Sequence, residues 1–183
     1  MGRGPGRGRR VLLGLAALML MGPGAATATS DTERAGDWLQ VLVPVGAWGL
    51  THARDDAEGR GQLYRAFGAT FLATHALKLT VHAERPRSSA TNSFPSGHTS
   101  AAFSGASFIQ YRYGWGWGAP AYALAGFVGY SRVHSRAHYT RDVVAGAALA
   151  IGMTHLFTTR HEGVEVAPVL GADGAGLSLR MAF

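Results

Sequence analysis

The segment from Ser131 to Asp142 holds the chain's densest group of side chains that could do chemistry. His134, His138 and Asp142 follow one another at intervals of four residues, so on a helix they would share one face. An aspartate that accepts the Nδ1–H of His138 would leave the other ring nitrogen free to attack an electrophile. Arg132 adds a planar fork suited to phosphate. The segment therefore predicts nucleophilic chemistry on a phosphorylated group, with a merely charged and solvated helix start as the alternative.

A second candidate group is formed by Ser96, Gly97 and His98, which follow Pro95 and precede a run of small and apolar residues. The run predicts a helix, so the group lies at a helix N-terminus. Free N–H groups and the helix dipole favour anions there, and Gly97 lets the backbone come close to a ligand. The pattern predicts an anion-binding turn.

Lys78 and Arg85 form the third candidate group, and Pro86 stops any helix that precedes it. Lys78 is the only lysine among the 17 Lys and Arg residues. The compositional bias that placed arginine everywhere else did not act at this position, which favours a specific role for the lysine.

Together these segments resemble the three-part signature of the type 2 phosphatidic acid phosphatase (PAP2) and vanadium haloperoxidase superfamily. The match covers roughly residues 62–157 and is complete at Lys78, Arg85, Pro86, Pro95, Ser96, Gly97, His98, Ser131, Arg132, His138 and Asp142. The resemblance implies a phosphomonoesterase or diphosphatase that works through a phosphohistidine.

On this resemblance each group has one role. His138 attacks phosphorus, Asp142 orients it, and His98 protonates the leaving oxygen and then activates water. The phosphoryl oxygens are held by Lys78, Arg85, Ser96, Gly97 and Arg132. Because the cations neutralise the developing charge, we expect neither a metal nor another cofactor. Vanadate, which mimics the transition state, is expected to inhibit.

Three alternatives stay open. The spacing of His134, His138 and Asp142 also suits metal ligands, so a metallohydrolase competes, although such a site would not need an anion-binding turn and three cations. A vanadate haloperoxidase would need more enclosing structure than this short chain offers. A non-enzymatic lipid- or anion-binding protein would leave His138 and Asp142 without a purpose.

The start of the chain carries arginines at 3, 7, 9 and 10, an apolar stretch over residues 11–22 and a small-residue cleavage pattern at residues 26–28. We therefore expect residues 1–28 to be a signal peptide, 29–163 the phosphatase domain and 164–183 a C-terminal β-hairpin. Without the leader the formal charge falls from +6 to +2, so nucleic-acid binding gains little support. The chain has no cysteine, which excludes disulfides and thiolate chemistry.

The sequence predicts an all-α, antiparallel bundle of about five helices. They are expected at 38–53 (bent or broken at Pro44), 62–82, 98–111, 118–130 and 139–158, after a loose lead-in at 29–37 and with a polar turn at 55–61. In the second helix, Leu63, Phe67, Phe71, Leu72 and Leu79 are expected as a buried stripe. Helix ends and starts alternate among the motifs, so in an antiparallel bundle all the motifs meet at one end.

Export and an apolar bundle favour a lipid substrate at the periplasmic face, such as phosphatidic acid, a prenyl diphosphate or lipid A, over a soluble ester cleaved by a non-specific acid phosphatase. The apolar stretches fall short of about 20 residues or are broken by glycine and proline. The protein is thus expected to be periplasmic and to contact the membrane surface, with membrane insertion as an alternative. The aromatic residues Tyr111, Tyr113, Trp115 and Trp117 would form either an interface belt or ordinary packing. The oligomeric state is not determined by the sequence.

Overall fold

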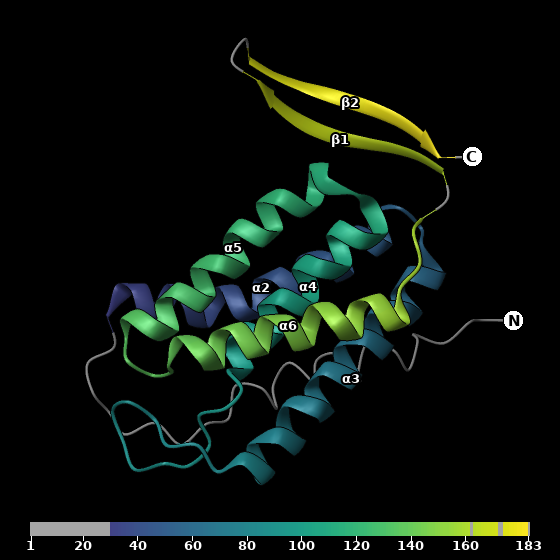
Figure 1. Cartoon of the computed structure of the whole chain (residues 1–183). Coiled ribbons are helices and arrows are strands. Elements are labelled where there is room, and N and C mark those ends of the chain that lie inside the picture. Colours follow the sequence, from purple (N-terminus) through teal and green to yellow (C-terminus); the bar gives the residue numbers. More distant parts are fainter. Residues whose placement is uncertain (1–29, 162, 172–173, 183) are drawn as a thin grey trace, which may run out of the picture.

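The computed structural model describes residues 30–161, 163–171 and 174–182 of the chain. Within them the elements follow in the order α2 (Asp31–Ala53), α3 (Ala57–Val81), α4 (Gly97–Tyr113), α5 (Trp115–His134), α6 (Thr140–Phe157), β1 (Gly163–Gly171) and β2 (Gly174–Ala182). Figure 1 shows the helices packed as one bundle, with the two strands beside it near α5. The expected all-α bundle is confirmed. The predicted signal peptide lies outside the described residues.

The first described helix begins earlier than expected. The hydroxyl of Ser30 accepts a hydrogen bond from the backbone N–H of Glu33 at 3.2 Å and caps a helix that starts at Asp31. The expectation of a loose lead-in at residues 29–37 was wrong. The helix also runs through Pro44 without a break. Pro44 is buried against α4, where a Cβ added at Gly105 would lie only 2.7 Å from Pro44 Cα, so tertiary packing outweighs the hydrogen bond that proline cannot make.

The expected stripe on α3 is correct for only part of its length. Leu63, Phe67 and Phe71 are buried, at 1%, 4% and 8% exposure, but Leu72 and Leu79 are 69% and 76% exposed. Leu72 follows Phe71 directly and so projects about 100° away from it around the helix. Leu79 lies near the C-terminal end of α3, which extends past the other helices in Figure 1.

The helix α4 lies at the centre of the bundle and contacts α2, α3, α5 and α6. Its side chains are mostly small, and Ala102, Ala106 and Phe108 are completely buried. Small residues also let backbones approach: a Cβ at Gly146 of α6 would lie 2.7 Å from the carbonyl oxygen of Ser96. The first half of α6 is thereby held against the start of α4.

A buried ion pair lies at the end of the bundle where α3 begins and α4 ends. Arg112, near the end of α4, donates to both carboxylate oxygens of Asp56 at 2.7 and 2.8 Å. The same carboxylate accepts hydrogen bonds from Gly59 N and Tyr113 Oη. Burial by itself raises the pKa of Asp56, but these hydrogen bonds outweigh it and hold the pKa well below its ordinary value. Tyr113 is therefore part of the interior, which rules out an interface belt that includes it; Trp115, 63% exposed, lies at this end as well.

The predicted C-terminal hairpin is present as an antiparallel pair in which Gly163 faces Ala182 and Gly171 faces Gly174. Its first strand contacts α5. Among the described helices, none combines the length and the hydropathy that crossing a membrane requires.

Candidate active site

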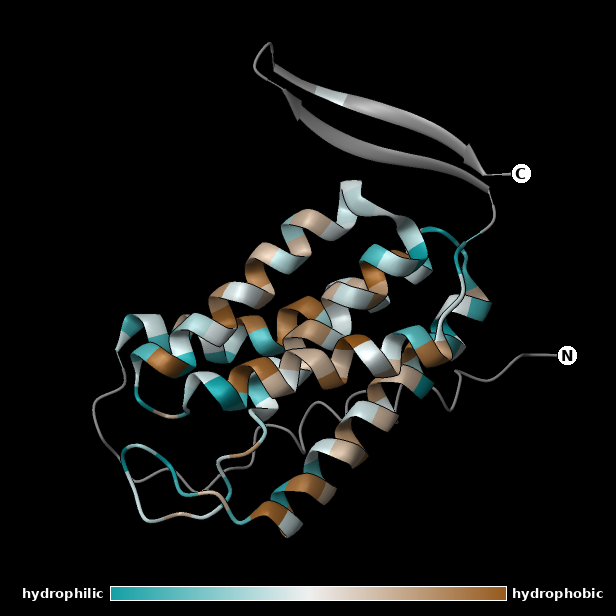
Figure 2. Ribbon diagram, viewed as in Figure 1, coloured by the Kyte–Doolittle hydropathy of each residue, from teal (hydrophilic) through white to brown (hydrophobic). Residues whose placement is uncertain are grey.

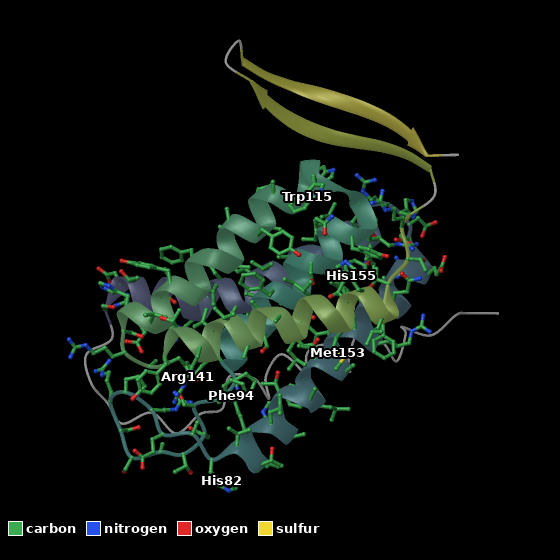
Figure 3. The ribbon with its side chains drawn as sticks, in the orientation of Figure 1. His82, Phe94, Trp115, Arg141, Met153 and His155 are labelled. Carbon is green, nitrogen blue, oxygen red and sulfur yellow. The ribbon has the colours of Figure 1, made fainter. Side chains whose placement is uncertain are left out.

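The three motif segments come together at one end of the bundle. The end of α3, the start of α4, the end of α5 and the start of α6 meet there, together with the loop over residues 82–96. In Figure 3, Phe94 of this loop and Arg141 of α6 lie at this end, whereas Trp115 lies at the opposite end.

His138 lies in the turn between α5 and α6 and is 3% exposed. Its Nδ1 is 3.6 Å from Asp142 Oδ2, which is too far for a hydrogen bond. The hydroxyl of Ser93 lies between the two: it donates to Asp142 Oδ2 at 2.5 Å, and its oxygen is 3.3 Å from His138 Nδ1. A hydroxyl that donates to the carboxylate can accept the Nδ1–H, which leaves Nε2 of His138 unprotonated. The expected direct contact between His138 and Asp142 is thus replaced by a relay through Ser93.

Asp142 is completely buried and connects three segments. Its Oδ2 accepts a hydrogen bond from Tyr139 N at 3.0 Å, which caps α6, and its backbone carbonyl accepts one from Ser96 N at 2.9 Å. An acid in the first turn of a helix is also favoured by the helix dipole. The carboxylate that faces Ser93 is therefore held in place by its hydrogen bond to Tyr139 N and is favoured by the dipole of α6.

The segment from Ser131 to Asp142 is not one helix. The helix α5 ends at His134, and α6 begins only at Thr140. His134 consequently does not share a face with His138 and Asp142; it is exposed, and its Nδ1 lies 3.4 Å from Tyr130 Oη. Within the described part of the chain, no three His, Cys, Asp or Glu side chains gather in a way that could hold a metal ion. His134, His138 and Asp142 therefore do not form the ligand set that the metallohydrolase alternative requires.

Ser96 is the N-cap of α4 and is completely buried. Its hydroxyl accepts hydrogen bonds from Thr99 Oγ1 at 3.0 Å and Thr99 N at 3.5 Å. The first N–H groups of a helix lack intrahelical partners and favour an anion. A Cβ at Gly97 would lie 3.8 Å from Lys78 Cε, so the start of α4 and the predicted phosphate-binding lysine lie side by side.

Lys78 and Arg85 are held by the same loop residue. Lys78 Nζ donates to the carbonyl of Asn92 at 2.7 Å, and Arg85 Nε donates to Asn92 Oδ1 at 2.8 Å. Burial lowers the pKa of Lys78 to about 8; the charge of Arg85 adds to this effect and that of Asp142 opposes it. Burial also lowers the pKa of Arg85. A bound anion would offset the cost of keeping these two cations close together.

Asp37, on α2, links two of the predicted site residues. Its Oδ1 lies 3.1 Å from His98 Nε2 and accepts a hydrogen bond from Arg132 Nη1 at 2.8 Å. The second guanidinium nitrogen of Arg132 donates to the carbonyl of Glu33 at 2.7 Å. Burial raises the pKa of Asp37, but the bond with His98 and the charge of Arg132 outweigh burial and lower it overall.

Asp37 and Ser93 were both missed by sequence reasoning. Ser30 and Glu33 have the Ser-x-x-Glu spacing of a capping box, a signal for a helix that starts at residue 31 and places Glu33 and Asp37 on one face. Ser93 and Asn92 carried no comparable signal, because only the folded loop brings them to the motif residues.

The two histidines of the site have lowered pKa values. Burial is the main cause for His138; the charges of Arg85, Lys78 and His98 add to it, and the pKa falls to about 2. Burial also lowers the pKa of His98, although its hydrogen bond to Asp37 opposes the effect. A neutral His138 keeps the lone pair that a nucleophile needs at any physiological pH.

Comparison with known proteins identifies the family of the chain. The model of the family described as PAP2 superfamily matches residues 62–164. Lipid A 4'-phosphatase of Helicobacter pylori is 35% identical over 141 residues, which cover 71% of this chain and 71% of that protein. Lipid A 1-phosphatase of Porphyromonas gingivalis is 41% identical over 71 residues, 37% of this chain and 16% of that protein.

A solved structure has a similar fold. The crystal structure of Aquifex aeolicus LpxE matches with a TM-score of 0.59 and 20% identity, over 79% of this chain and 92% of that chain. The family match spans more than half of the 183 residues and includes all three motif segments. The chain therefore belongs to the PAP2 superfamily and is a phosphoric ester hydrolase.

Proposed function

We propose that the chain removes phosphate from a lipid A-type lipid through a phosphohistidine intermediate and without a metal. The observation that carries the proposal is the environment of His138. The ring is buried, and burial together with the nearby charges of Arg85 and Lys78 lowers its pKa and favours the uncharged form. An uncharged nucleophile among fixed cations suits attack on a phosphoryl group, whose oxygens the cations would hold.

The proposed reaction has two steps. In the first, Nε2 of His138 forms a bond to phosphorus, the ester P–O bond breaks, and His98 gives its proton to the leaving oxygen. In the second, His98 takes a proton from water, the water oxygen bonds to phosphorus, and the P–N bond breaks. Ser93 and Asp142 hold the His138 ring, and Lys78, Arg85, Arg132 and the start of α4 hold the phosphoryl oxygens throughout.

The relatives support the substrate class. Those that match are named for the 1- and 4'-phosphates of lipid A, and we carry this class, not a position on it, to the present chain. A non-specific acid phosphatase acting on soluble esters is the main competitor. Vanadate should inhibit, and any haloperoxidase activity should stay trace.

We also propose contact with a membrane surface on the periplasmic side. Large exposed apolar side chains flank the site: Trp38, next to Asp37, is 70% exposed, and Leu79 and Val81 are 76% and 47% exposed. Figure 2 shows hydrophobic residues at this end of α3. In cosedimentation with phospholipid vesicles, Trp38→Ser with Leu79→Ser should reduce the bound fraction. Leu156→Ser, equally exposed on α6, is the control, and an equal loss there would count against this surface.

The decisive experiment is a phosphate-release panel on the purified protein with lipid A, phosphatidic acid, a prenyl diphosphate and a soluble phosphomonoester, with and without chelator. Quenched reactions should contain an acid-labile phosphoprotein. His138→Ala should lose both phosphoprotein and turnover, at least about a thousandfold in rate, while the exposed His134→Ala should still form the phosphoprotein. Normal turnover by folded His138→Ala would exclude the phosphohistidine route, and chelator-sensitive activity restored by zinc or manganese would favour a metallohydrolase.

A further inference from the structure

An open hollow of about 270 Å³ lies beside the proposed catalytic site. The residues that line it all have polar or charged side chains and are Ser30, Glu33, Arg87, His134, Ser135 and Arg136. Pockets that hold a whole drug-sized ligand span roughly 300–1,000 Å³ and are mostly apolar. This hollow therefore suits one polar group of a larger molecule.

Arg132 links the hollow to the proposed catalytic site. Its guanidinium is bonded to the Glu33 carbonyl at 2.7 Å, and its own carbonyl accepts from Ser135 Oγ at 3.4 Å. The carbonyl of Ser135 in turn accepts from Arg87 Nη1 at 2.8 Å. Arg132 is therefore bonded to two residues that line the hollow, Glu33 and Ser135, and to Asp37 in the proposed catalytic site.

The charged side chains that line the hollow, two arginines and one glutamate, have a net positive charge. Arg87 lies 4.0 Å from the carboxylate of Glu33, so these two charges offset each other. Arg136 is exposed, and within the described residues its guanidinium makes no hydrogen bond or ion pair. Its φ of 54° is in the left-handed region, which is costly for a residue with a side chain and tends to occur at functional positions. The strained turn thus presents an available cation to the hollow.

The same two segments supply cations to both places. The loop after α3 gives Arg85 to the proposed catalytic site and Arg87 to the hollow. The end of α5 gives Arg132 to the proposed catalytic site, and the turn after α5 gives Arg136 to the hollow. We propose that the hollow is a second anion subsite, which binds a second phosphate group of the same substrate molecule. Ser30, Ser135 and the carboxylate of Glu33 offer hydrogen-bond partners for hydroxyl groups between the two phosphates. This inference rests on the proposed function and adds to it a preference for doubly phosphorylated lipids.

The test compares lipid A carrying two phosphates with its two monophosphorylated forms in the same detergent. For the wild type we expect a lower KM for the doubly phosphorylated lipid. Arg136→Glu should raise that KM at least about tenfold and Arg136→Ala about fivefold, with the KM of the monophosphates changing less than twofold, and the difference should shrink at high salt. The control is Arg34→Glu, which makes the same charge change beside Glu33 at an exposed position outside the hollow. It measures the general electrostatic attraction between the protein and the phosphorylated lipid.

Equilibrium binding of the same lipids to His138→Ala separates this inference from the proposed function, because it needs no turnover. If the wild type releases no phosphate from any lipid, the proposed function fails, and the binding preference alone decides the subsite. Equal affinity for doubly and singly phosphorylated lipid would overturn the subsite. An equal effect of Arg34→Glu and Arg136→Glu, or an effect of Arg136→Glu on all lipids alike, would do so as well.

Discussion

At the scale of single residues, Asp37 connects a proposed proton donor to a proposed phosphate ligand. Its Oδ1 contacts both His98 and Arg132, so one carboxylate affects the proton affinity of the histidine and the direction of the guanidinium. Asp37 raises the pKa of His98 against the effect of burial. We therefore assign it the role of a positioning residue that acts through His98.

This role predicts a specific change in the pH profile. Without the carboxylate, the pKa of His98 falls further, and a lower pH is then needed for the same protonated fraction of the general acid. Asp37→Asn should move the limb of kcat/KM that depends on protonated His98 to lower pH and reduce the maximum by roughly 10²-fold, the low end for general acid catalysis. Asp31→Asn, which is exposed on the same helix, should leave the profile unchanged. A uniform loss at every pH would indicate a merely structural role.

Lys78 predicts a second limb on which activity falls with rising pH, at a higher pH than the limb of His98. Its pKa is lowered to about 8, and the ammonium form is the one that binds phosphate, so kcat/KM should fall as the pH rises through about 8. Lys78→Arg stays charged in this range and should remove that limb, while its wide planar fork fits the site less well and weakens vanadate inhibition about tenfold. Values of kcat/KM and vanadate inhibition constants, both measured from pH 6 to 10, test the two statements. An unchanged vanadate affinity for Lys78→Arg would place Lys78 outside the phosphate site.

At the scale of elements, the sequence predicts helices better than it predicts the contacts between their side chains. The motif-bearing helix ends could be placed because Pro86, Pro95 and the apolar runs mark them. Ser93 and Asn92 could not be identified, because they act through hydrogen bonds that exist only once the loop folds back onto α6 and α3. Leu79 was misassigned because periodicity gives the faces of a helix but not where its neighbours end.

The close contact between α4 and α6 leaves no room for a single added methyl group. A Cβ at Gly146 would lie 2.7 Å from the Ser96 carbonyl oxygen, and a backbone atom cannot move aside as a flexible side chain can. Overpacking costs about 1–3 kcal/mol, whereas Gly→Ala in a helix gains up to about 1 kcal/mol. Gly146→Ala should therefore lower the free energy of unfolding and also reduce kcat, because Ser96 is displaced.

The matched control for this prediction lies on the same helix. Gly152 is exposed, and a Cβ there would meet nothing within 4 Å. Gly152→Ala should keep kcat and gain up to about 1 kcal/mol of stability. Urea unfolding and phosphate release measured on both variants are sufficient, and equal stabilities for the two would contradict the close contact.

At the scale of the whole molecule, the two ends of the bundle have different electrostatic designs. The site end gathers cations, such as Lys78 and Arg85, whose pKa values are lowered mainly by burial. At the opposite end, Arg112 and Asp56 neutralise each other within a full set of hydrogen bonds. Arg112 also holds the chain after α6 through the carbonyl of Thr159 at 3.0 Å. Charge at one end is available to a substrate, and at the other it stabilises the fold.

This division predicts that stability and catalysis can be separated. Arg112→Ala leaves the buried carboxylate of Asp56 without its cation, which should cost about 3–5 kcal/mol in the free energy of unfolding. The distant site should keep the KM and kcat of the fraction that stays folded. The pH dependence has a definite sign: the folded pKa of Asp56 lies below its unfolded value of 3.8, so its stabilisation is present above that pH and is lost as the pH falls through the folded pKa.

Because Arg112→Ala removes most of that stabilisation, the variant should lose less stability than the wild type as the pH falls from 5 to 2. The double variant Asp56→Asn with Arg112→Met, which buries no unpaired charge, should recover much of the loss. Urea unfolding across this pH range, with phosphate release measured at neutral pH, provides both readouts. A large loss of kcat in folded Arg112→Ala would show that the two ends are coupled and would contradict the division of roles between them.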